Sequence, residues 1–170
     1  MDNNLFEPRY MNNRDFPSFD AIQNATYKPL FIESETIFYK RLKLFPQGAW
    51  ISEDRTLPVG YLFCHPWLLN DLVSQGDLNI QLPANTDCFY IHSLTIIPTY
   101  HRKGIGRMFY EKAKRIADSF SYQRIALVSV QESYPFWAGF GFRVVSPVDA
   151  LMKAKLAEYG PDARYMIRNQ

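Results

Sequence analysis

One segment limits the possible folds of this chain more than any other. Residues 88–130 hold a strand-like run, a proline, a basic turn with two glycines, an amphipathic segment and a second strand-like run. The first run, CFYIHSLTII, is rich in aromatic and β-branched residues and stops at Pro98. Apolar residues then recur at helical spacing over 104–120, and RIALVSV over 124–130 predicts another strand. If the two strands share a sheet, they form a parallel pair with a right-handed helical crossover.

Similar patterns predict further helices and strands on both sides of this segment. Helices are predicted over 14–26, 33–45 and 134–140, with a helix-like piece over 147–159. Strands are predicted over 6–11, 48–53, 59–65, 141–146 and 163–168. Residues 54–58 predict a hairpin, and 66–86 predict a long, mostly irregular connection of the kind that is usually functional. We therefore expect a mixed α/β fold in a single domain over residues 1–170.

Composition excludes several classes of function. The net charge is only +2 and the basic run at 101–103 is short, which argues against a nucleic-acid partner. The sequence has no 18-residue apolar run and no signal-peptide pattern, so we expect a cytoplasmic protein without a membrane partner. Cys64 and Cys88 are expected to be free, buried thiols. A monomer or a homodimer is compatible with the sequence, and the exposed edge of a final strand could pair with a partner.

The two glycines stand where the long helix is expected to begin. A helix N-terminus exposes unpaired N–H groups and the positive end of the helix dipole. Gly104 and Gly106 would leave these N–H groups accessible to an anion, and the neighbouring basic residues add positive potential. The spacing fits neither a P-loop nor a dinucleotide fingerprint, which would need a third glycine where Phe109 stands. The turn therefore predicts a phosphate or pyrophosphate site, and a simple glycine turn before a surface helix is the alternative.

The wider context of this turn resembles one family. Residues 88–145 resemble the GCN5-related N-acetyltransferases (GNAT), whose pyrophosphate loop reads Gln/Arg-x-x-Gly-x-Gly/Ala. The corresponding residues run from His101 to Gly106, and His101 departs from the Gln or Arg of the pattern. Gly141 and Phe142 match the family's closing Gly-Phe. The resemblance implies the GNAT fold, a mixed central sheet of about six to seven strands flanked by helices, with a splayed parallel strand pair.

The resemblance also implies acetyl-CoA as co-substrate and no metal. The backbone of Leu94, Thr95 and Ile96 would pair with the pantetheine arm. The pyrophosphate would be held by residues of the turn and of the first helical turn: His101, Arg102, Lys103, Gly104, Ile105, Gly106 and Arg107. A helix N-terminus needs no metal for this task, and the three histidines of the chain lie in three different segments.

His92 is the candidate general base for acetyl transfer to an amine. Its imidazole titrates near neutrality, and strand alternation would place it on one face with Tyr90, Leu94 and Ile96, unless a bulge in this strand changes the facing. The segment also resembles the arylalkylamine (serotonin) N-acetyltransferase branch, which carries two histidines two residues apart on this strand. His92 matches the second histidine and Tyr90 replaces the first, so the resemblance implies a relay of one histidine and one tyrosine. A satisfied core histidine is the alternative.

The leaving thiolate could take a proton from a side chain or from water. Related enzymes often carry a tyrosine where this chain has Trp137, whose indole N–H is too weak an acid. Tyr134, about one helical turn earlier, could take that role, as could water, and Trp137 would then simply pack.

The acceptor site is expected near residues 29–34 and 65–87, which resemble the arylalkylamine branch. Trp67 and Leu68 could form an apolar wall, or only anchor the long loop. Glu33, Asp71 or Asp77 could pair with a cationic amine. We therefore expect an acetyl-CoA-dependent N-acetyltransferase that acts on a small arylalkylamine or polyamine by direct attack in a ternary complex. The alternatives are a non-catalytic acyl-CoA sensor, a peptide or protein amine acetyltransferase, and a phosphate-binding domain unrelated to CoA.

Overall fold

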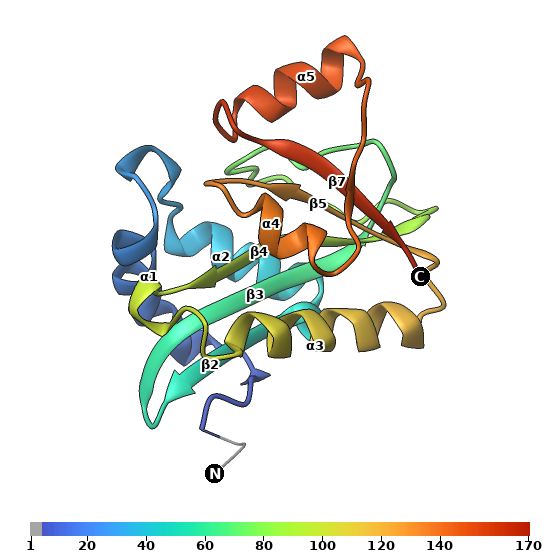
Figure 1. Ribbon diagram of the computed structural model, residues 1–170. Helices are drawn as coiled ribbons and strands as arrows, with labels where there is room; N and C mark the ends of the chain where they lie inside the picture. Colours follow the sequence, from blue (N-terminus) through green and yellow to red (C-terminus); the bar gives the residue numbers. More distant parts are fainter. Residues whose placement is uncertain (1–4) are drawn as a thin grey trace.

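A seven-stranded mixed sheet forms the centre of the protein, in a computed structural model that describes residues 5–170 (Figure 1). The order across the sheet is β1-β2-β3-β4-β5-β7-β6. The strands are β1 (Arg9–Tyr10), β2 (Ala49–Asp54), β3 (Leu57–Trp67), β4 (Cys88–Ile96), β5 (Arg124–Ser129), β6 (Arg143–Val144) and β7 (Arg164–Asn169). The α-helices are α1 (Phe19–Thr26), α2 (Glu35–Leu44), α3 (Ile105–Ser119), α4 (Tyr134–Ala138) and α5 (Ala150–Ala157).

The predicted elements are confirmed, with two differences. The helix predicted over 14–26 is divided into a 3-10 segment, Asn13–Ser18, and α1, because Pro17 lacks the N–H group that a continuous helix would use. The final strand, β7, lies between β5 and β6 rather than at an edge, so the expectation of an exposed final strand was wrong. Both edge strands, β1 and β6, contain only two residues. In the described part of the chain, no helix is long and apolar enough to cross a membrane.

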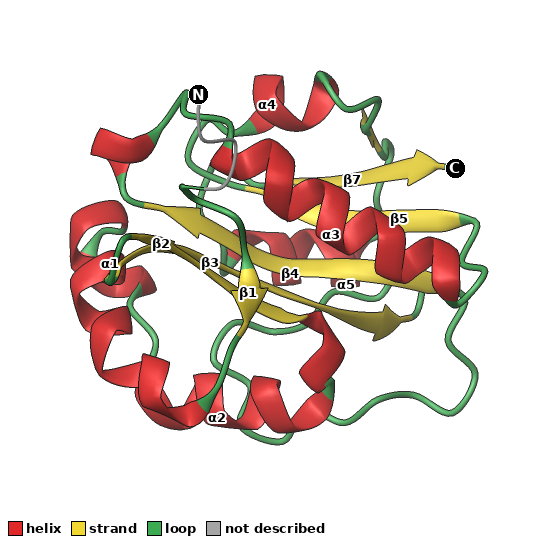
Figure 2. Cartoon of the chain, turned by 90° about the horizontal axis from the view of Figure 1, so that it is seen from below, coloured by secondary structure: helices red, strands yellow, loops and turns green. Residues whose placement is uncertain are grey.

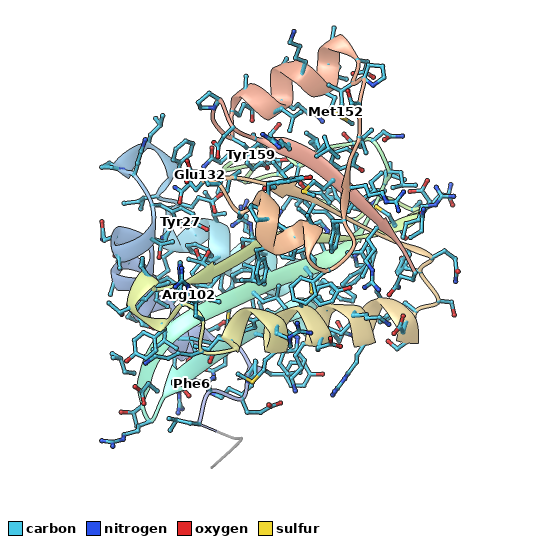
Figure 3. The ribbon with its side chains drawn as sticks, in the orientation of Figure 1. Phe6, Tyr27, Arg102, Glu132, Met152 and Tyr159 are labelled. Carbon is cyan, nitrogen blue, oxygen red and sulfur yellow. The ribbon has the colours of Figure 1, made fainter. Side chains whose placement is uncertain are left out.

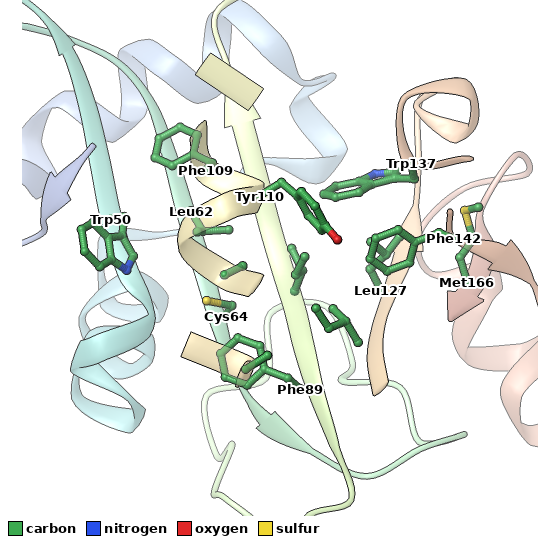
Figure 4. Close-up of a cluster of buried hydrophobic side chains, with 14 of the residues drawn as sticks. Trp50, Leu62, Cys64, Phe89, Phe109, Tyr110, Leu127, Trp137, Phe142 and Met166 are labelled. Atoms are coloured by element: carbon green, nitrogen blue, oxygen red, sulfur yellow. The ribbon is translucent and has the colours of Figure 1, made fainter. Parts of the chain in front are cut away.

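Helices cover both faces of the sheet (Figure 2). On one face, α3 and α4 pack on a cluster that includes Phe109, Phe89 and Trp137 (Figure 4). The other face packs against α1 and α2, where Phe19 and Phe38 surround Tyr61, and against α5 farther along. Alternate residues of each strand therefore enter different clusters, as the two-residue period of a strand requires. Cys64 and Cys88 are both buried and free, as expected.

The parallel pair at the centre of the sheet is short. β4 and β5 pair only from Phe89 to Ile91, opposite Ile125 to Leu127, and no pairing joins the two strands beyond that point. On its other side β4 stays paired with β3 as far as Ile96. This pairing contains a bulge, since Phe63 pairs with Ser93 and Cys64 pairs with Ile91, which leaves His92 as the extra residue. The strand separation and the bulge thus occur at the same place.

Candidate active site

A cleft of about 1020 Å³ opens where β4 and β5 separate. Its floor is β4 from Ile91 to Ile96. We call one end the α3 half, which is lined by His101, Arg102, Gly104, Ile105, Gly106, Arg107, Phe136 and Phe140. We call the other end the α1 half, which is lined by Thr26, Tyr27, Phe31, Glu33, Gln75, Glu132 and Tyr159. Figure 3 labels Arg102 in the first half, and Tyr27, Glu132 and Tyr159 in the second.

The turn before α3 has an unusual backbone. Gly104 has φ +85°, and a Cβ atom on it would meet nothing within 4 Å, so any side chain would project into open space. Gly106 has a different constraint, since a Cβ there would lie 2.9 Å from the ring of Phe136. The first glycine gives the turn its left-handed conformation and keeps its surface clear. The second lets α4 approach the start of α3.

This turn presents several unpaired N–H groups to the cleft. No acceptor within the described residues takes a hydrogen bond from the backbone N–H groups of residues 102–107, and α3 begins its own bonds with the N–H of Met108 to Gly104. Unpaired N–H groups and the positive end of a 15-residue helix attract anions. The cationic side chains of Arg102 and Arg107 also line the cleft. The residues present fit a pyrophosphate group.

Two of the predicted phosphate ligands have other contacts. Nε2 of His101 lies 2.9 Å from the carbonyl oxygen of Ile96, to which a ring N–H can donate, so this side chain ties the turn to the end of β4. The ammonium of Lys103 lies 4.5 Å from the centre of the Tyr100 ring, and the residue does not line the cleft. Arg102 and Arg107 therefore supply the cationic side chains that face an anion here, together with the backbone.

The floor of the cleft has a free backbone edge. Leu94, Thr95 and Ile96 pair with Leu62, Tyr61 and Gly60 of β3 on one side. On the other side their edge faces the gap between β4 and β5, where the described strands make no pairing and only the carbonyl of Ile96 is engaged, by His101. An extended amide chain could pair with this edge as an additional strand would.

The bulge decides the direction of the His92 side chain. Leu94 and Ile96 pack on the α3 face of the sheet. The ring of His92 instead lies 5.7 Å from that of His65 and 6.1 Å from that of Tyr90, on the opposite face. The prediction that His92 shares a face with Leu94 and Ile96 was therefore wrong, because the extra residue at the bulge reverses the alternation. His92 still shares its face with Tyr90.

The environment of His92 keeps its imidazole neutral. Burial, followed by the positive charge of Arg41 and the neighbouring His65, holds the pKa of His92 well below its usual 6.5. A neutral imidazole that lines a cleft can accept a proton. Tyr90 lies behind it rather than in the cleft, and burial raises the pKa of Tyr90 well above 10.

His65 was not recognised from the sequence as part of this site. The β3–β4 register places it directly opposite Tyr90, so the two histidines expected in separate segments lie together. The available signal was the predicted hairpin-like succession of β3 and β4. To place His65 opposite Tyr90, one must know the register between β3 and β4. Sequence patterns do not give that register across a long connection.

The predicted proton donor is not in the cleft. Tyr134 is the first residue of α4, and because helical side chains lean toward the N-terminus, its ring lies 4.9 Å from the guanidinium carbon of Arg164 instead. Trp137 is buried and packs against Phe142 at the cleft wall, as the packing interpretation expected. Tyr134 therefore has no position from which to protonate a leaving group in the cleft.

The long loop contributes differently from the prediction. Trp67 is buried in the cluster beneath α5, and neither Trp67 nor Leu68 lines the cleft. Asp71 forms an ion pair with Lys155 at 2.7 Å, and Asp77 caps a turn of its own loop. These predicted acceptor residues lie elsewhere because residues 71–75 contact α5 and the turn after it, and residues 78–81 lie beside α2. Only Gln75 of this loop reaches the cleft.

Glu33 does line the cleft, but its carboxylate is already paired with Arg41. Its two oxygens accept hydrogen bonds of 2.6 Å from both terminal nitrogens of Arg41, and the N–H of Gly76 adds a third at 3.2 Å. Glu132 also lines the cleft and forms no ion pair within residues 5–170. It has φ +61° and is held by a 2.8 Å hydrogen bond from its N–H to Asp162.

Three segments meet over the α1 half. A Cβ atom on Gly160 would lie 3.5 Å from Phe31, so the chain after α5 approaches the segment between α1 and α2. The hydroxyl of Tyr159 donates to the carbonyl of Val73, and the N–H of Gln75 donates to Glu158 at 3.2 Å. The lining of the α1 half is therefore assembled from segments that are far apart in the sequence.

Comparisons with known proteins agree with this geometry. The loading GNATL domain of CurA from Lyngbya majuscula has a TM-score of 0.78 at 13% identity, with 98% of each chain covered. The NatC complex bound to Gag peptide and CoA contains a chain with a TM-score of 0.69 at 20% identity, covering 97% of this chain and 98% of that chain. Naa20 from Chaetomium thermophilum, in complex with a bisubstrate analogue, has a TM-score of 0.67 at 18% identity, with 96% and 86% covered.

These structures are similar in fold. No curated protein sequence matches the chain. The model of the acetyltransferase (GNAT) family matches residues 12–142, which include the whole α3 half and His92. The family that the turn at residues 101–106 indicated is therefore confirmed, and with it the enzyme class: the chain belongs to the acetyltransferase (GNAT) family.

Proposed function

We propose that this enzyme transfers the acetyl group of acetyl-CoA to a small primary amine, with His92 as general base. The observation that carries this proposal is the position of His92. It is the bulged residue of β4, it lines the cleft, and it lies between the anion-binding turn and the carboxylate-bearing α1 half. In this proposal, acetyl-CoA occupies the α3 half, the amine occupies the α1 half, and His92 lies between them as the proton acceptor.

The α3 half suits the co-substrate. The unpaired N–H groups before α3, with Arg102 and Arg107, would hold the pyrophosphate. The free edge of β4 at Leu94–Ile96 would pair with the amide groups of pantetheine, which places the thioester near the bulge. The NatC structure similar to this chain is one that contains CoA.

The chemistry needs only one side chain that accepts a proton. The amine nitrogen attacks the thioester carbon, its proton passes to Nε2 of His92, and the C–S bond then breaks to release the thiolate of CoA. N–H groups on the free edge of β4 can stabilise the oxyanion. A thiol has a pKa of about 8.5, so its thiolate is a good leaving group without an obligatory acid. The exclusion of Tyr134 from the cleft is compatible with this mechanism.

The charges of the cleft favour a cationic acceptor. Arg102 and Arg107 make the α3 half positive, whereas Glu132 brings an unpaired carboxylate to the α1 half. Tyr27, Phe31 and Tyr159 supply aromatic walls there, which suit the methylene groups or ring of an amine. The segment around Gly160 lies close to Phe31, and this proximity narrows the α1 half in a way that favours a small arylalkylamine or polyamine over a peptide.

Turnover separates this function from its alternatives. Thiol release from acetyl-CoA should rise above the hydrolysis background with tryptamine, phenethylamine or spermidine, and should stay near background with short peptides. Activity on peptides alone would instead favour a peptide amine acetyltransferase. If no amine is acetylated while CoA still raises the melting temperature, the acyl-CoA sensor is the better description.

A further inference from the structure

Several buried polar atoms near the proposed base have no hydrogen-bond partner. Nδ1 of His92, Nε2 of His65 and Nε1 of Trp67 are all enclosed and unpaired within the described residues. The three rings form a row on one face of β3 and β4, with His65 5.7 Å from His92 and 5.3 Å from Trp67. An unpaired buried polar atom costs about 1–3 kcal/mol, so three neighbours of this kind need an explanation.

The proton on His65 is fixed by the backbone. Nδ1 of His65 lies 2.9 Å from the carbonyl oxygen of Pro66, which can only accept a hydrogen bond. Nδ1 therefore carries the proton, and Nε2 presents a lone pair. Burial lowers the pKa of His65 to about 4, so this neutral form persists at physiological pH. His65 thus offers a buried acceptor beside His92.

His92 needs an acceptor at the same place. To take a proton from the substrate at Nε2, its imidazole must carry the resting proton on Nδ1. Nδ1 is the enclosed nitrogen, and no direct hydrogen bond joins it to a described residue. In the opposite tautomer His92 would present an N–H to the cleft and could not act as the base.

We propose that Nε2 of His65 accepts the Nδ1–H of His92 through one buried water molecule and thereby sets the tautomer that makes His92 a base. His65 is then a positioning residue, since it acts on His92 through this water molecule and does not contact the substrate. A single water would accept the N–H of His92 and donate to His65, which satisfies both atoms. The assignment of His92 as base rests on the proposed function, whereas the tautomer itself does not.

Ser93, the residue after His92, has a buried hydroxyl that is unpaired within the described residues and is the alternative acceptor, so the variants below are designed to test His65 specifically. The charged and aromatic neighbours of His92 do not provide this acceptor. Arg41 only donates, and both oxygens of its partner Glu33 are engaged by that guanidinium. The hydroxyl of Tyr159 donates to Val73, and Tyr90 lies on the same strand as His92, with a ring centre 6.1 Å away. The indole of Trp67 has an N–H donor and no acceptor, so it cannot accept a hydrogen bond from His92. It could donate to the same water molecule.

The tautomer can be measured without any activity. In ¹⁵N NMR spectra of the histidine side chains at pH 7, His92 should carry its proton on Nδ1 in the wild type. His65→Phe should remove this preference, and His65→Gln, which keeps an acceptor oxygen, should retain most of it. Trp67→Phe is the matched control, because it removes a buried N–H from the same row and should leave the tautomer of His92 unchanged.

Kinetics supply the second readout. His65→Phe should lower kcat about 10- to 100-fold and move the acid limb of the profile to lower pH, with the KM for acetyl-CoA unchanged. His65→Gln should recover most of kcat. An Nε2–H tautomer of His92 in the wild type, or a tautomer that survives His65→Phe, would overturn the inference. Absence of turnover with every amine would count against the proposed function and not against the tautomer result.

Discussion

The two ends of the cleft are built in different ways. In the α3 half, one continuous stretch from His101 to Arg107 provides the exposed backbone N–H groups and the two arginines that suit an anion. The α1 half and the histidine row behind it come from separate segments that meet only in the folded protein. The first half recognises a ligand with main chain, and the second depends on the placement of side chains. Substitutions in the two halves should therefore have different consequences.

The largest effect is expected at the junction of the two halves. His92→Ala should lower kcat by about 10²- to 10⁴-fold, because general-base catalysis is lost, while the affinity for CoA stays nearly unchanged. Because the pKa of His92 lies well below 6.5, the wild-type rate should fall only below that pH, and this acid limb should disappear in the variant. Steady-state kinetics across pH 5–9 would test this, and an unchanged pH profile would remove His92 as the base.

The main-chain half can be tested at a single glycine. Gly104→Val should weaken CoA binding by about 100-fold or more, because a branched side chain at φ +85° strains the turn and projects into the anion site. Gly141→Val is the matched control. Gly141 has φ +88°, so the strain is similar, but it does not line the cleft. Calorimetric titration with CoA should separate them, and equal losses of affinity would show that strain alone is responsible.

The histidine row should make stability sensitive to acid. The folded protein keeps His65 neutral down to about pH 4, whereas the unfolded chain binds this proton near pH 6.5. The free energy of unfolding should therefore fall as pH drops through this window, by at most about 3 kcal/mol from this residue. Urea unfolding of the wild type and of His65→Gln at pH 7 and pH 4.5 would measure the difference. Parallel losses in both proteins would contradict the expectation.

The smallest effect is expected at the open carboxylate. Glu132→Gln should raise the KM for a diamine or polyamine several-fold and leave kcat and the KM for acetyl-CoA unchanged, because the side chain is exposed and contributes only charge. Asp77→Asn, which likewise removes one carboxylate but at a residue that does not line the cleft, is the control. A KM that rises equally for neutral and cationic amines would argue against a charge effect.

Much of the fold follows from local patterns. The strand–helix–strand segment predicted over 88–130 corresponds closely to β4, α3 and β5, because period, proline stops and glycine turns all act over short distances. The anion-binding turn was predictable for the same reason, since its N–H groups and arginines are neighbours in the chain. His92 was also identified correctly as a residue of the cleft.

The errors all concern direction or pairing. The bulge at His92 reversed the side chains after it, and no local pattern shows where a bulge will fall. Tyr134 was placed by helical spacing alone, but at the first position of a five-residue helix its side chain leans out toward Arg164. Trp67 and Leu68 were assigned to the cleft by their position in the long loop, whereas part of that loop contacts α5.

The sequence by itself thus determined the family, the order of the elements and the glycine turn before α3, because each is encoded by residues that are adjacent along the chain. Only the tertiary structure decided that His65 lies beside His92, that Arg41 pairs with Glu33, and that Glu132 in the cleft forms no ion pair with any of the described residues 5–170. These facts depend on strand register and on the packing of distant segments. Strand register and packing depend on contacts between residues that are far apart in the sequence, so no single stretch of residues determines them.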